Sequence, residues 1–329
     1  MKVVAIGGGT GLSTILTGLK KEYGISIKRL TAVVTVADSG GSSGILKKIY
    51  DIPAIGDLRN CLLALSNIES YFKKTIQHRF SKGEGLRGHP LGNLFLLALL
   101  ETEGDILKAI KKASKILNLT GEIIPSTFDK VDLIAKFDDD TEIVGEENIF
   151  KYGLLSKHRI VDLKIVSEKG KINVPNELIK RILSADLIIF GPGSLFTSIL
   201  PNVVIKDIRQ SIIDSKAIKI FIVNLLTQPG ETDNFTASDH VREFLKFSQL
   251  ERIDAVIINK GEIIDRNLRK IMIQENKQFV YPDIEKIKNL GIKVYSGFLI
   301  KKDSYLKHSP YKLTKLILKI AKDYGIIKK

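Results

Sequence analysis

The sequence predicts a Rossmann-like, doubly wound α/β fold with a mainly parallel sheet and a small antiparallel β insertion. Short apolar runs alternate with helical patterns along most of the 329-residue chain. Polar, glycine-rich loops follow several of these runs, and such loops meet at the carboxyl edge of a parallel sheet. Between about residues 121 and 171 shorter alternating runs replace this pattern. We therefore expect one α/β domain over residues 1–329, with residues 121–171 as an antiparallel insertion or an edge extension of the sheet.

The first loop, residues 7–11, lies between an apolar run at 3–6 and a helical pattern that starts near Leu12. Bare backbone N–H groups at a helix N-terminus bind anions, phosphates above all. Gly8, Gly9, Thr10 and Gly11 are therefore candidate ligand residues. The loop reads G-x-G-x-x-T and no Lys follows it, so it matches neither the standard dinucleotide fingerprint nor a Walker A site. A plain tight turn between a strand and a helix is the alternative.

A second loop, residues 38–44, follows an apolar run at 30–37 and precedes a helical pattern from Ile45 to just before Pro53. Residues 57–60 then open another helix, which we place over 62–68, and Asp57 is well positioned as its N-cap. Arg59 in a first helical turn opposes the helix dipole. Contact with an anionic ligand and simple exposure are both open for Arg59.

A third loop, residues 81–93, leads into the most apolar helix, around 94–100. His89 shares this loop with Arg87 and Asn93, which allows a ligand or acid–base role; an ordinary surface or core histidine is the alternative. An amphipathic helix follows over 105–117. Strands are predicted at 131–137, 141–144 and 160–166, and the acidic triplet at 138–140 lacks EF-hand spacing, so it is a solvated turn.

The α/β pattern returns with a helix at 176–184 and a strand at 187–190, which ends in the polar loop 191–202. Ser194, Thr197 and Ser198 could donate hydrogen bonds to a ligand there, and an N-cap serine in a turn is the alternative. A strand at 218–224 precedes residues 227–232, and Ser238 is expected to cap a helix through Phe247. A strand at 254–258, a weaker one near Val294 and a basic amphipathic helix from Tyr311 complete the chain.

The composition, 44% hydrophobic and 27% charged, is that of an ordinary globular protein. We see no signal peptide, and the longest apolar run is too short for a bilayer, which requires about 20 residues; the expected location is the cytoplasm. The single cysteine, Cys61, excludes a disulfide framework and predicts a buried packing thiol. The formal charge of +14 comes from lysines spread along the chain. No nucleic-acid motif accompanies them, so they predict a solvated surface that favours anionic ligands.

Six motifs taken together resemble the YvcK family, often named gluconeogenesis factors, within the superfamily of CofD, the 2-phospho-L-lactate transferase. In order, they read GGGTG, VADSGGSSG, GDLRNCLLAL, GEGLRGHPLGNLFLLAL, GPGSLFTSILPN and NLLTQPGETDNFTASDHV. The resemblance spans Val4 to about Asn259. Two departures stand out: Ser39 replaces the second Asp of the usual VADDGGSSG, and RGHPL at 87–91 replaces a common SGHSF. Losing one of two adjacent carboxylates weakens any divalent-ion site there.

The resemblance implies a Rossmann-like fold, binding of a UDP-sugar such as UDP-N-acetylglucosamine, and a link to cell-wall precursor supply and cell shape on gluconeogenic carbon sources. By inference from chemistry, the first loop would cradle the nucleotide, and Gly193, Ser194 and Thr197 would form the opposite wall. The phosphate and second-substrate side would be lined by Asp38, Ser42, Ser43, Gly44, Asp57, Arg59 and Asn60. Ser39, Gly40 and Gly41 are further candidate ligand-binding residues of the same loop. His89, Asn93, Asn224 and Thr227 complete the candidate set.

Two hypotheses follow. In the leading one the protein is a cytoplasmic regulator that senses a UDP-sugar, with no metal site, no certain cofactor and no established reaction. In the alternative it is a Mg²⁺-dependent phosphotransferase in which Asp38 or Asp57 helps to place a diphosphate and Arg59 stabilises developing charge. We also expect protein partners in cell-wall synthesis and a homo-oligomer, with neither nucleic acid nor a membrane span.

Overall fold

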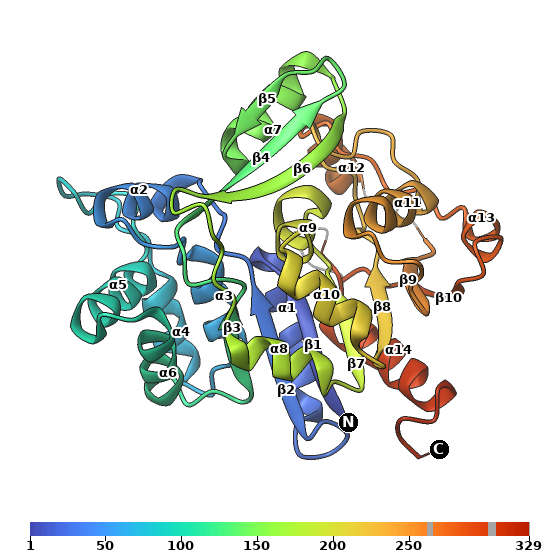
Figure 1. The fold of residues 1–329 in the computed structure, drawn as a ribbon, viewed down its shortest axis with the longest axis horizontal. Coiled ribbons are helices and arrows are strands. Elements are labelled where there is room, and N and C mark those ends of the chain that lie inside the picture. The colour runs from blue at the N-terminus through green and yellow to red at the C-terminus, as the bar shows by residue number, and fades with distance from the viewer. Residues whose placement is uncertain (262–265, 302–306, 329) are drawn as a thin grey trace.

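The computed structural model describes residues 1–261, 266–301 and 307–328. Within them, seven parallel strands form the central sheet in the order β3-β2-β1-β7-β8-β9-β10 (Figure 1). The order reverses between β1 and β7, and the crevice beyond the carboxyl ends of such strands is where doubly wound folds bind ligands. The predicted Rossmann-like class is confirmed. The strands are β1 (Lys2–Gly7), β2 (Arg29–Val34), β3 (Glu122–Pro125), β7 (Leu187–Phe190), β8 (Ile218–Ile222), β9 (Ala255–Asn259) and β10 (Lys293–Gly297).

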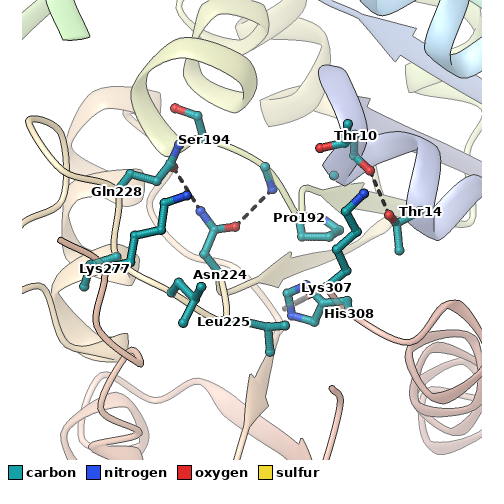
Figure 2. A pocket seen from close by; sticks show the side chains of 14 residues that line it. Thr10, Thr14, Pro192, Ser194, Asn224, Leu225, Gln228, Lys277, Lys307 and His308 are labelled. Carbon is teal, nitrogen blue, oxygen red and sulfur yellow. Dashed lines mark hydrogen bonds between the residues drawn. The ribbon is translucent and has the colours of Figure 1, made fainter. Parts of the chain in front are cut away.

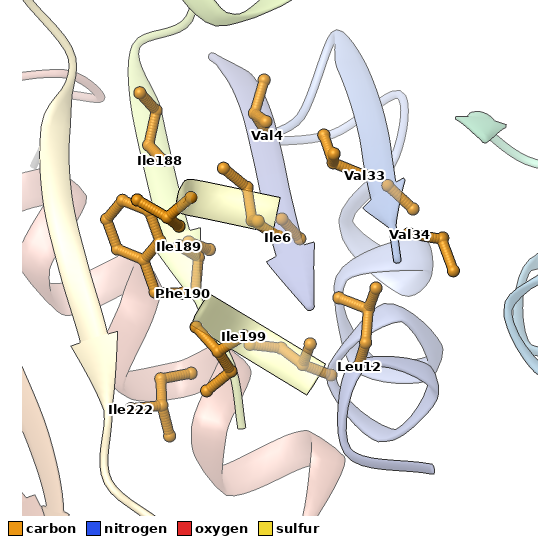
Figure 3. Packing of buried hydrophobic residues seen from close by; sticks show 14 of the residues in the cluster. Val4, Ile6, Leu12, Val33, Val34, Ile188, Ile189, Phe190, Ile199 and Ile222 are labelled. Atoms are coloured by element: carbon orange, nitrogen blue, oxygen red, sulfur yellow. The ribbon is translucent and has the colours of Figure 1, made fainter. Parts of the chain in front are cut away.

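The middle of the sheet is apolar because helices cover both of its faces. Ile6 in β1 lies between Val33 of β2 and Phe190 of β7, and all three side chains are fully buried. Figure 3 shows these residues with Leu12 and Ile199 packed below the ends of the strands. Strands buried on both faces read as continuous apolar runs, which is why the sequence locates β1, β2 and β7 so well.

Helices α1, α3 and α14 cover one face of the sheet, and α8 and α10 cover the other (Figure 1). Gly18 permits close packing of α1 on α14, because a β-carbon there would lie 2.3 Å from the Thr314 hydroxyl. The helices are α1 (Gly9–Leu19), η1 (Lys20–Glu22), α2 (Gly41–Tyr50), α3 (Gly56–Leu65), α4 (Ser70–Gln77), α5 (Leu91–Glu103), α6 (Ile106–Ile116), α7 (Glu146–Ser156), α8 (Asn176–Leu183), η2 (Leu195–Ile199), α9 (Leu200–Val203), α10 (Lys206–Asp214), α11 (Ala237–Ser248), α12 (Arg266–Gln274), α13 (Ile284–Lys288) and α14 (Pro310–Asp323).

A separate antiparallel sheet of order β5-β4-β6 lies beside the carboxyl edge of the main sheet (Figure 1). It comprises β4 (Val131–Phe137), β5 (Glu142–Val144) and β6 (Ile160–Ser167), with α7 between β5 and β6. The small antiparallel insertion is thus present, but it begins later than residue 121, because β3 pairs in parallel with β2 in the main sheet. The sequence analysis also missed α7. We call residues 131–167 the insertion.

Several helix starts differ from those predicted. Helices α1, α2 and α3 begin at Gly9, Gly41 and Gly56, each earlier than expected. The sequence analysis did not extend these helices to the glycines, because glycine is a poor helix former. In the structure each glycine lies in a first turn. The cap of α11 is Thr236, whose side chain accepts a hydrogen bond from the Asp239 backbone. Ser238 instead lies inside α11 and donates to Asp283 over 2.6 Å.

Cys61 is fully buried among the core side chains, as predicted for a packing thiol. Among the helices of the described ranges, none is both long enough and apolar enough to cross a membrane.

Candidate functional site

The β1–α1 loop places a helix N-terminus at the switch point of the sheet. Gly8 is the N-cap of α1 and has no side chain with which to cap the first-turn N–H groups. Gly11 lets this turn pack on the loop after β7, since a β-carbon would lie 2.2 Å from the Pro192 carbonyl oxygen. Gly9 has a φ of +57°, which favours glycine. These positions leave bare backbone where an anion would be attracted.

Asp57 reaches this loop from the first turn of α3. It is not the N-cap, contrary to the sequence prediction, because Ile55 occupies that position. Its carboxylate instead lies against Gly8, where a β-carbon would be 2.4 Å from Oδ2. Burial and the neighbouring Asp38 carboxylate raise the pKa of Asp57 to about 7, against the opposing effects of the Gly9 backbone and Arg59. Asp57 can therefore exchange a proton near neutral pH.

The β2–α2 loop places Asp38 beside Asp57. Asp38 Oδ1 accepts a hydrogen bond of 2.8 Å from the Gly40 N–H, which fixes the start of α2. Ser39 points toward the insertion, where its hydroxyl accepts a hydrogen bond of 3.3 Å from the Glu147 N–H. Ser43 faces α3 and accepts a hydrogen bond of 3.2 Å from the Gly56 N–H. Through these hydrogen bonds the β2–α2 loop links α2, α3 and the insertion next to the Asp38 carboxylate.

Behind this loop lies a buried polar network. Ser42 Oγ and His89 Nδ1 share a hydrogen bond of 2.8 Å, and Asn93 Nδ2 donates to the same Ser42 oxygen over 2.9 Å. Asn93 Oδ1 accepts from Arg59 over 3.1 Å, and Asn60 Oδ1 accepts from Arg59 over 2.8 Å. The network holds α2, α3 and α5 together. In this arrangement Arg59 and His89 support the loops that carry the carboxylates.

The loop after β7 contributes the opposite wall. Ser194 Oγ accepts a hydrogen bond of 3.1 Å from the Thr197 N–H, as expected for an N-cap serine, and it donates to the Glu231 carboxylate. Burial raises the pKa of Glu231 to about 7, although hydrogen bonds from the Ser194 and Thr197 hydroxyls favour its ionised form. The Gly193 N–H donates to Asn224 Oδ1 over 3.1 Å, so the β7 and β8 loops form one wall.

The insertion supplies a further carboxylate, Glu146, at the start of α7. Burial, together with Asp38 and Asp57, raises its pKa well above the ordinary value. The helix is held near the β8–α11 loop by a contact between two glycines, since a β-carbon on Gly153 would lie 1.9 Å from the Gly230 carbonyl oxygen. The insertion therefore forms part of the site.

Two adjoining cavities result. The larger, about 450 Å³, is the acidic cavity, lined by Gly8, Gly9, Thr10, Gly11, Asp38, Gly40, Asp57, Glu146, Glu147, Phe150, Gly193, Ser194, Thr197, Ser198, Gln228 and Glu231. The smaller, about 220 Å³, is the side cavity, lined by Thr10, Gly11, Thr14, Pro192, Gly193, Ser194, Asn224, Leu225, Leu226, Thr227, Gln228, Lys277, Lys307 and His308. Figure 2 shows Lys277 on the side of Asn224 and Gln228, and Lys307 on the side of Thr10 and Thr14.

Comparison with known proteins decides the family. A family model described as 2-phospho-L-lactate transferase CofD matches residues 3–300. The chain belongs to the CofD family. Within it, a putative gluconeogenesis factor from Aquifex aeolicus is 53% identical over 321 residues, covering 97% of this chain and 96% of that protein. A gluconeogenesis factor from Bacillus subtilis is 39% identical and covers 98% of both chains. The resemblance to the gluconeogenesis factors of this family is thus confirmed.

The fold of this CofD-family chain is shared by a solved relative. A crystal structure of a protein from Bacillus halodurans has a TM-score of 0.90 and 38% sequence identity, and the match covers 96% of this chain and 99% of that one. The seven-stranded and three-stranded sheets are therefore an arrangement found in the family.

The structure brings together only part of the predicted site. The predicted residues that line the acidic cavity are Gly8, Gly9, Thr10, Gly11, Asp38, Gly40, Asp57, Gly193, Ser194, Thr197 and Ser198. Asn224 and Thr227 line the side cavity, and Asn60 lines a third cavity described below. The predicted residues that line none of the three are Ser39, Gly41, Ser42, Ser43, Gly44, Arg59, His89 and Asn93.

Sequence reasoning missed Glu146, Phe150, Glu231, Lys277 and Lys307. Glu231 lies in a polar loop that follows a strand, and this position could have pointed to the site. Glu146 and Phe150 carry no local signal, because they belong to a helix that the sequence analysis did not expect.

A magnesium ion would find oxygen ligands in Asp38 and Asp57. Mg²⁺ is usually held by one or two carboxylates together with phosphates and water. The two carboxylates lie close enough for Asp38 to raise the pKa of Asp57. Among the described residues no group of three or more His, Cys, Asp or Glu side chains is arranged to hold a metal ion. Asp38 and Asp57 could therefore supply at most two of the oxygen ligands of a Mg²⁺ ion, and a phosphate-bearing ligand and water would have to supply the others.

Proposed function

We propose that the protein binds a UDP-sugar and acts as a regulator that links gluconeogenic carbon metabolism to cell-wall synthesis and cell shape. The observation that supports it is the position of the α1 N-terminus between two cavities. The residues that line both cavities are Thr10, Gly11, Gly193, Ser194 and Gln228. A nucleotide sugar has a diphosphate between two hydroxyl-bearing ends, which matches an anion-binding turn between two chambers.

The polar groups of each cavity suit a different end of such a ligand. Asp38, Glu146 and Glu231 in the acidic cavity can accept hydrogen bonds from sugar hydroxyls. Asn224 and Gln228 in the side cavity carry amides, which can pair with a pyrimidine. The sugar would therefore occupy the acidic cavity and the nucleoside the side cavity.

The regulatory part of the proposal rests on the relatives, which are named gluconeogenesis factors. A regulator needs reversible binding rather than turnover. Cell-wall synthesis enters through the proposed ligand, because UDP-N-acetylglucosamine is a wall precursor.

Isothermal titration with UDP-N-acetylglucosamine, UDP, GDP and NAD⁺, each with and without Mg²⁺, tests the proposal. We expect the UDP-sugar to bind most tightly. Asn224→Ala should weaken UDP and UDP-sugar alike, because it removes a group from the nucleoside end. Glu146→Gln should weaken the UDP-sugar more than UDP, whereas Glu142→Gln, an exposed change elsewhere in the insertion, should alter neither. Equal affinities for UDP, GDP and NAD⁺ would argue against a nucleotide-sugar site.

A second candidate function is the Mg²⁺-dependent transferase. The observation in its favour is Asp57, whose pKa of about 7 beside the α1 N-terminus is suited to a general base at neutral pH. Asp57→Asn should abolish product formation in a transferase but leave sugar-nucleotide affinity within a few-fold in a regulator. Chromatography of UDP-sugar incubated with protein and Mg²⁺ distinguishes the two.

A further inference from the structure

A third cavity, about 510 Å³, lies along the flank of α1 and is rich in lysine. Its described lining residues are Thr10, Ser13, Thr14, Thr17, Lys20, Lys21, Asn60, Leu63, Ala64, Lys73, Gln77, Lys301, Lys307, His308 and Pro310. We call it the lysine cavity. None of these residues is acidic, whereas the acidic cavity has five carboxylates and, among its own described lining, no lysine or arginine. The two cavities meet at Thr10, so opposite charges are separated across the first turn of α1.

Two of these lysines converge on a single acceptor. Lys20 Nζ and Lys73 Nζ donate to the same Ser66 carbonyl oxygen, over 2.6 Å and 3.0 Å. Neither ammonium group has a carboxylate within 4.0 Å among the described residues. Burial lowers the pKa of both, and the repulsion from Lys73 lowers that of Lys20 further. The pair is therefore a site of uncompensated positive charge.

Part of this arrangement has a structural explanation. Ser66 is the C-cap of α3, and cations stabilise the carbonyl end of a helix. One lysine is enough for that purpose, and the second adds repulsion that a carbonyl oxygen offsets only partly. A polyanion between the two ammonium groups would remove the repulsion. Hydroxyls of Thr14 and Thr17 and the Asn60 amide, all on the cavity wall, could complete its hydrogen bonds.

We propose that the lysine cavity is a second binding site, which takes a small polyanion bearing phosphate or carboxylate groups. Its Lys20 and Lys73 end is distinct from the proposed UDP-sugar site, because the residues that the lysine cavity shares with the acidic and side cavities are Thr10, Thr14, Lys307 and His308, and they include neither Lys20 nor Lys73. A ligand there would contact the same turn of α1 that faces the acidic cavity. A ligand in this position could be a metabolite that modulates binding at the first site, or it could be a second substrate.

Isothermal titration of the full-length protein with pyrophosphate and, separately, with citrate tests this proposal at low ionic strength. The two arms distinguish phosphate from carboxylate recognition. We expect saturable binding of at least one anion, and a loss of at least about tenfold in affinity in the Lys20→Gln/Lys73→Gln variant. Lys74→Gln is the matched control, because Lys74 lies on the same helix but outside the cavity lining; its affinity should stay within about twofold.

Unchanged affinity in the double variant would overturn the proposal, since the anion would then be bound elsewhere, for example at the β1–α1 loop. A lower melting temperature with unchanged affinity would show that the two lysines only cap α3. Absence of saturable anion binding to the wild-type protein would also overturn the proposal. If the double variant does not fold, Lys73→Gln by itself retains Lys20 as the cap and should still weaken binding. The UDP-sugar titrations are read separately, so failure of one site does not imply failure of the other.

Discussion

The Asp57 carboxylate occupies the space that a side chain at position 8 would fill. A β-carbon on Gly8 would lie 2.4 Å from Asp57 Oδ2 and 2.8 Å from Thr35 Cγ2. The backbone of Gly8 is extended, with a φ of −160°, so the requirement for glycine comes from space and not from backbone conformation. The start of α1 and the Asp57 carboxylate of α3 consequently pack against each other without a ligand.

Gly8→Ala should therefore both destabilise the fold and weaken ligand binding. We expect a loss of about 1–3 kcal/mol in the free energy of unfolding, because overpacking of this kind forces the backbone or Asp57 to move. Urea denaturation measures it. Gly297→Ala is the control, since its β-carbon would meet only ordinary contacts at 3.7 Å and 3.9 Å. Equal stability in the two variants would mean that Asp57 turns away freely.

Stability should depend on pH through Asp57. Its pKa in the folded protein, about 7, lies above the ordinary value of 3.8, so the native state holds a proton that the unfolded chain has lost. The resulting stabilisation is present at low pH and is lost as pH rises from about 4 to about 7. Asp57→Asn should therefore lose less stability than the wild type between these values. Urea denaturation of the wild type and of Asp57→Asn at pH 5 and pH 7.5 measures the free energies of unfolding. An equal loss of stability in the two proteins would show that Asp57 does not cause the pH dependence.

Ser194 should stabilise both the helical turn that follows it and the ionised form of Glu231. Ser194→Ala removes an N-cap, a change that typically costs about 0.5–2 kcal/mol, and removes a donor from the Glu231 carboxylate. The pKa of Glu231 should rise further, because its ionised form loses a hydrogen bond. Thermal unfolding and carboxyl NMR titration measure the two effects. Ser198→Ala, which alters a nearby hydroxyl of the same cavity, should produce neither.

The contact between Gly153 and Gly230 should keep the insertion against the site. Alanine is the better helix former by about 1 kcal/mol, yet Gly153→Ala would place its β-carbon 1.9 Å from the Gly230 carbonyl oxygen. We expect faster hydrogen exchange across residues 131–167 and weaker ligand binding, with the exchange of β1 and β7 unchanged. Lys151→Ala on the same helix is the control. Slower exchange in Gly153→Ala would show that helix propensity outweighs the contact.

The sequence predicts the strands better than the helix starts, for a physical reason. β4 and β7 have the predicted bounds, since a half-buried strand alternates and a fully buried one is continuously apolar. Helices that begin on glycine lack such a signal, because tertiary contacts and not propensity set their first turns. Asp57 illustrates this: its position at a helix start suggests a cap, but packing directs the carboxylate to Gly8.

The carboxylates of the site were only partly predictable. Asp38 follows the end of β2 and Asp57 lies in the first turn of α3, and both belong to motifs. Glu146 comes from an unexpected helix of the insertion and gains its place through contacts distant in sequence. Ser39, where the resemblance leads us to expect Asp, accepts a hydrogen bond from the Glu147 backbone. A serine can fill this acceptor role without adding a second charge beside Asp38.

The central place of β1 in the sheet also constrains when the site can form during synthesis. One edge of β1 pairs with β2, but the other pairs with β7, which leaves the ribosome about 180 residues later, on the order of ten to thirty seconds at typical rates of synthesis. Until then the nascent chain carries the glycine turn without its opposite wall, and β1 presents an open edge. Chains released before residue 190 would have no binding site and an exposed template for aggregation.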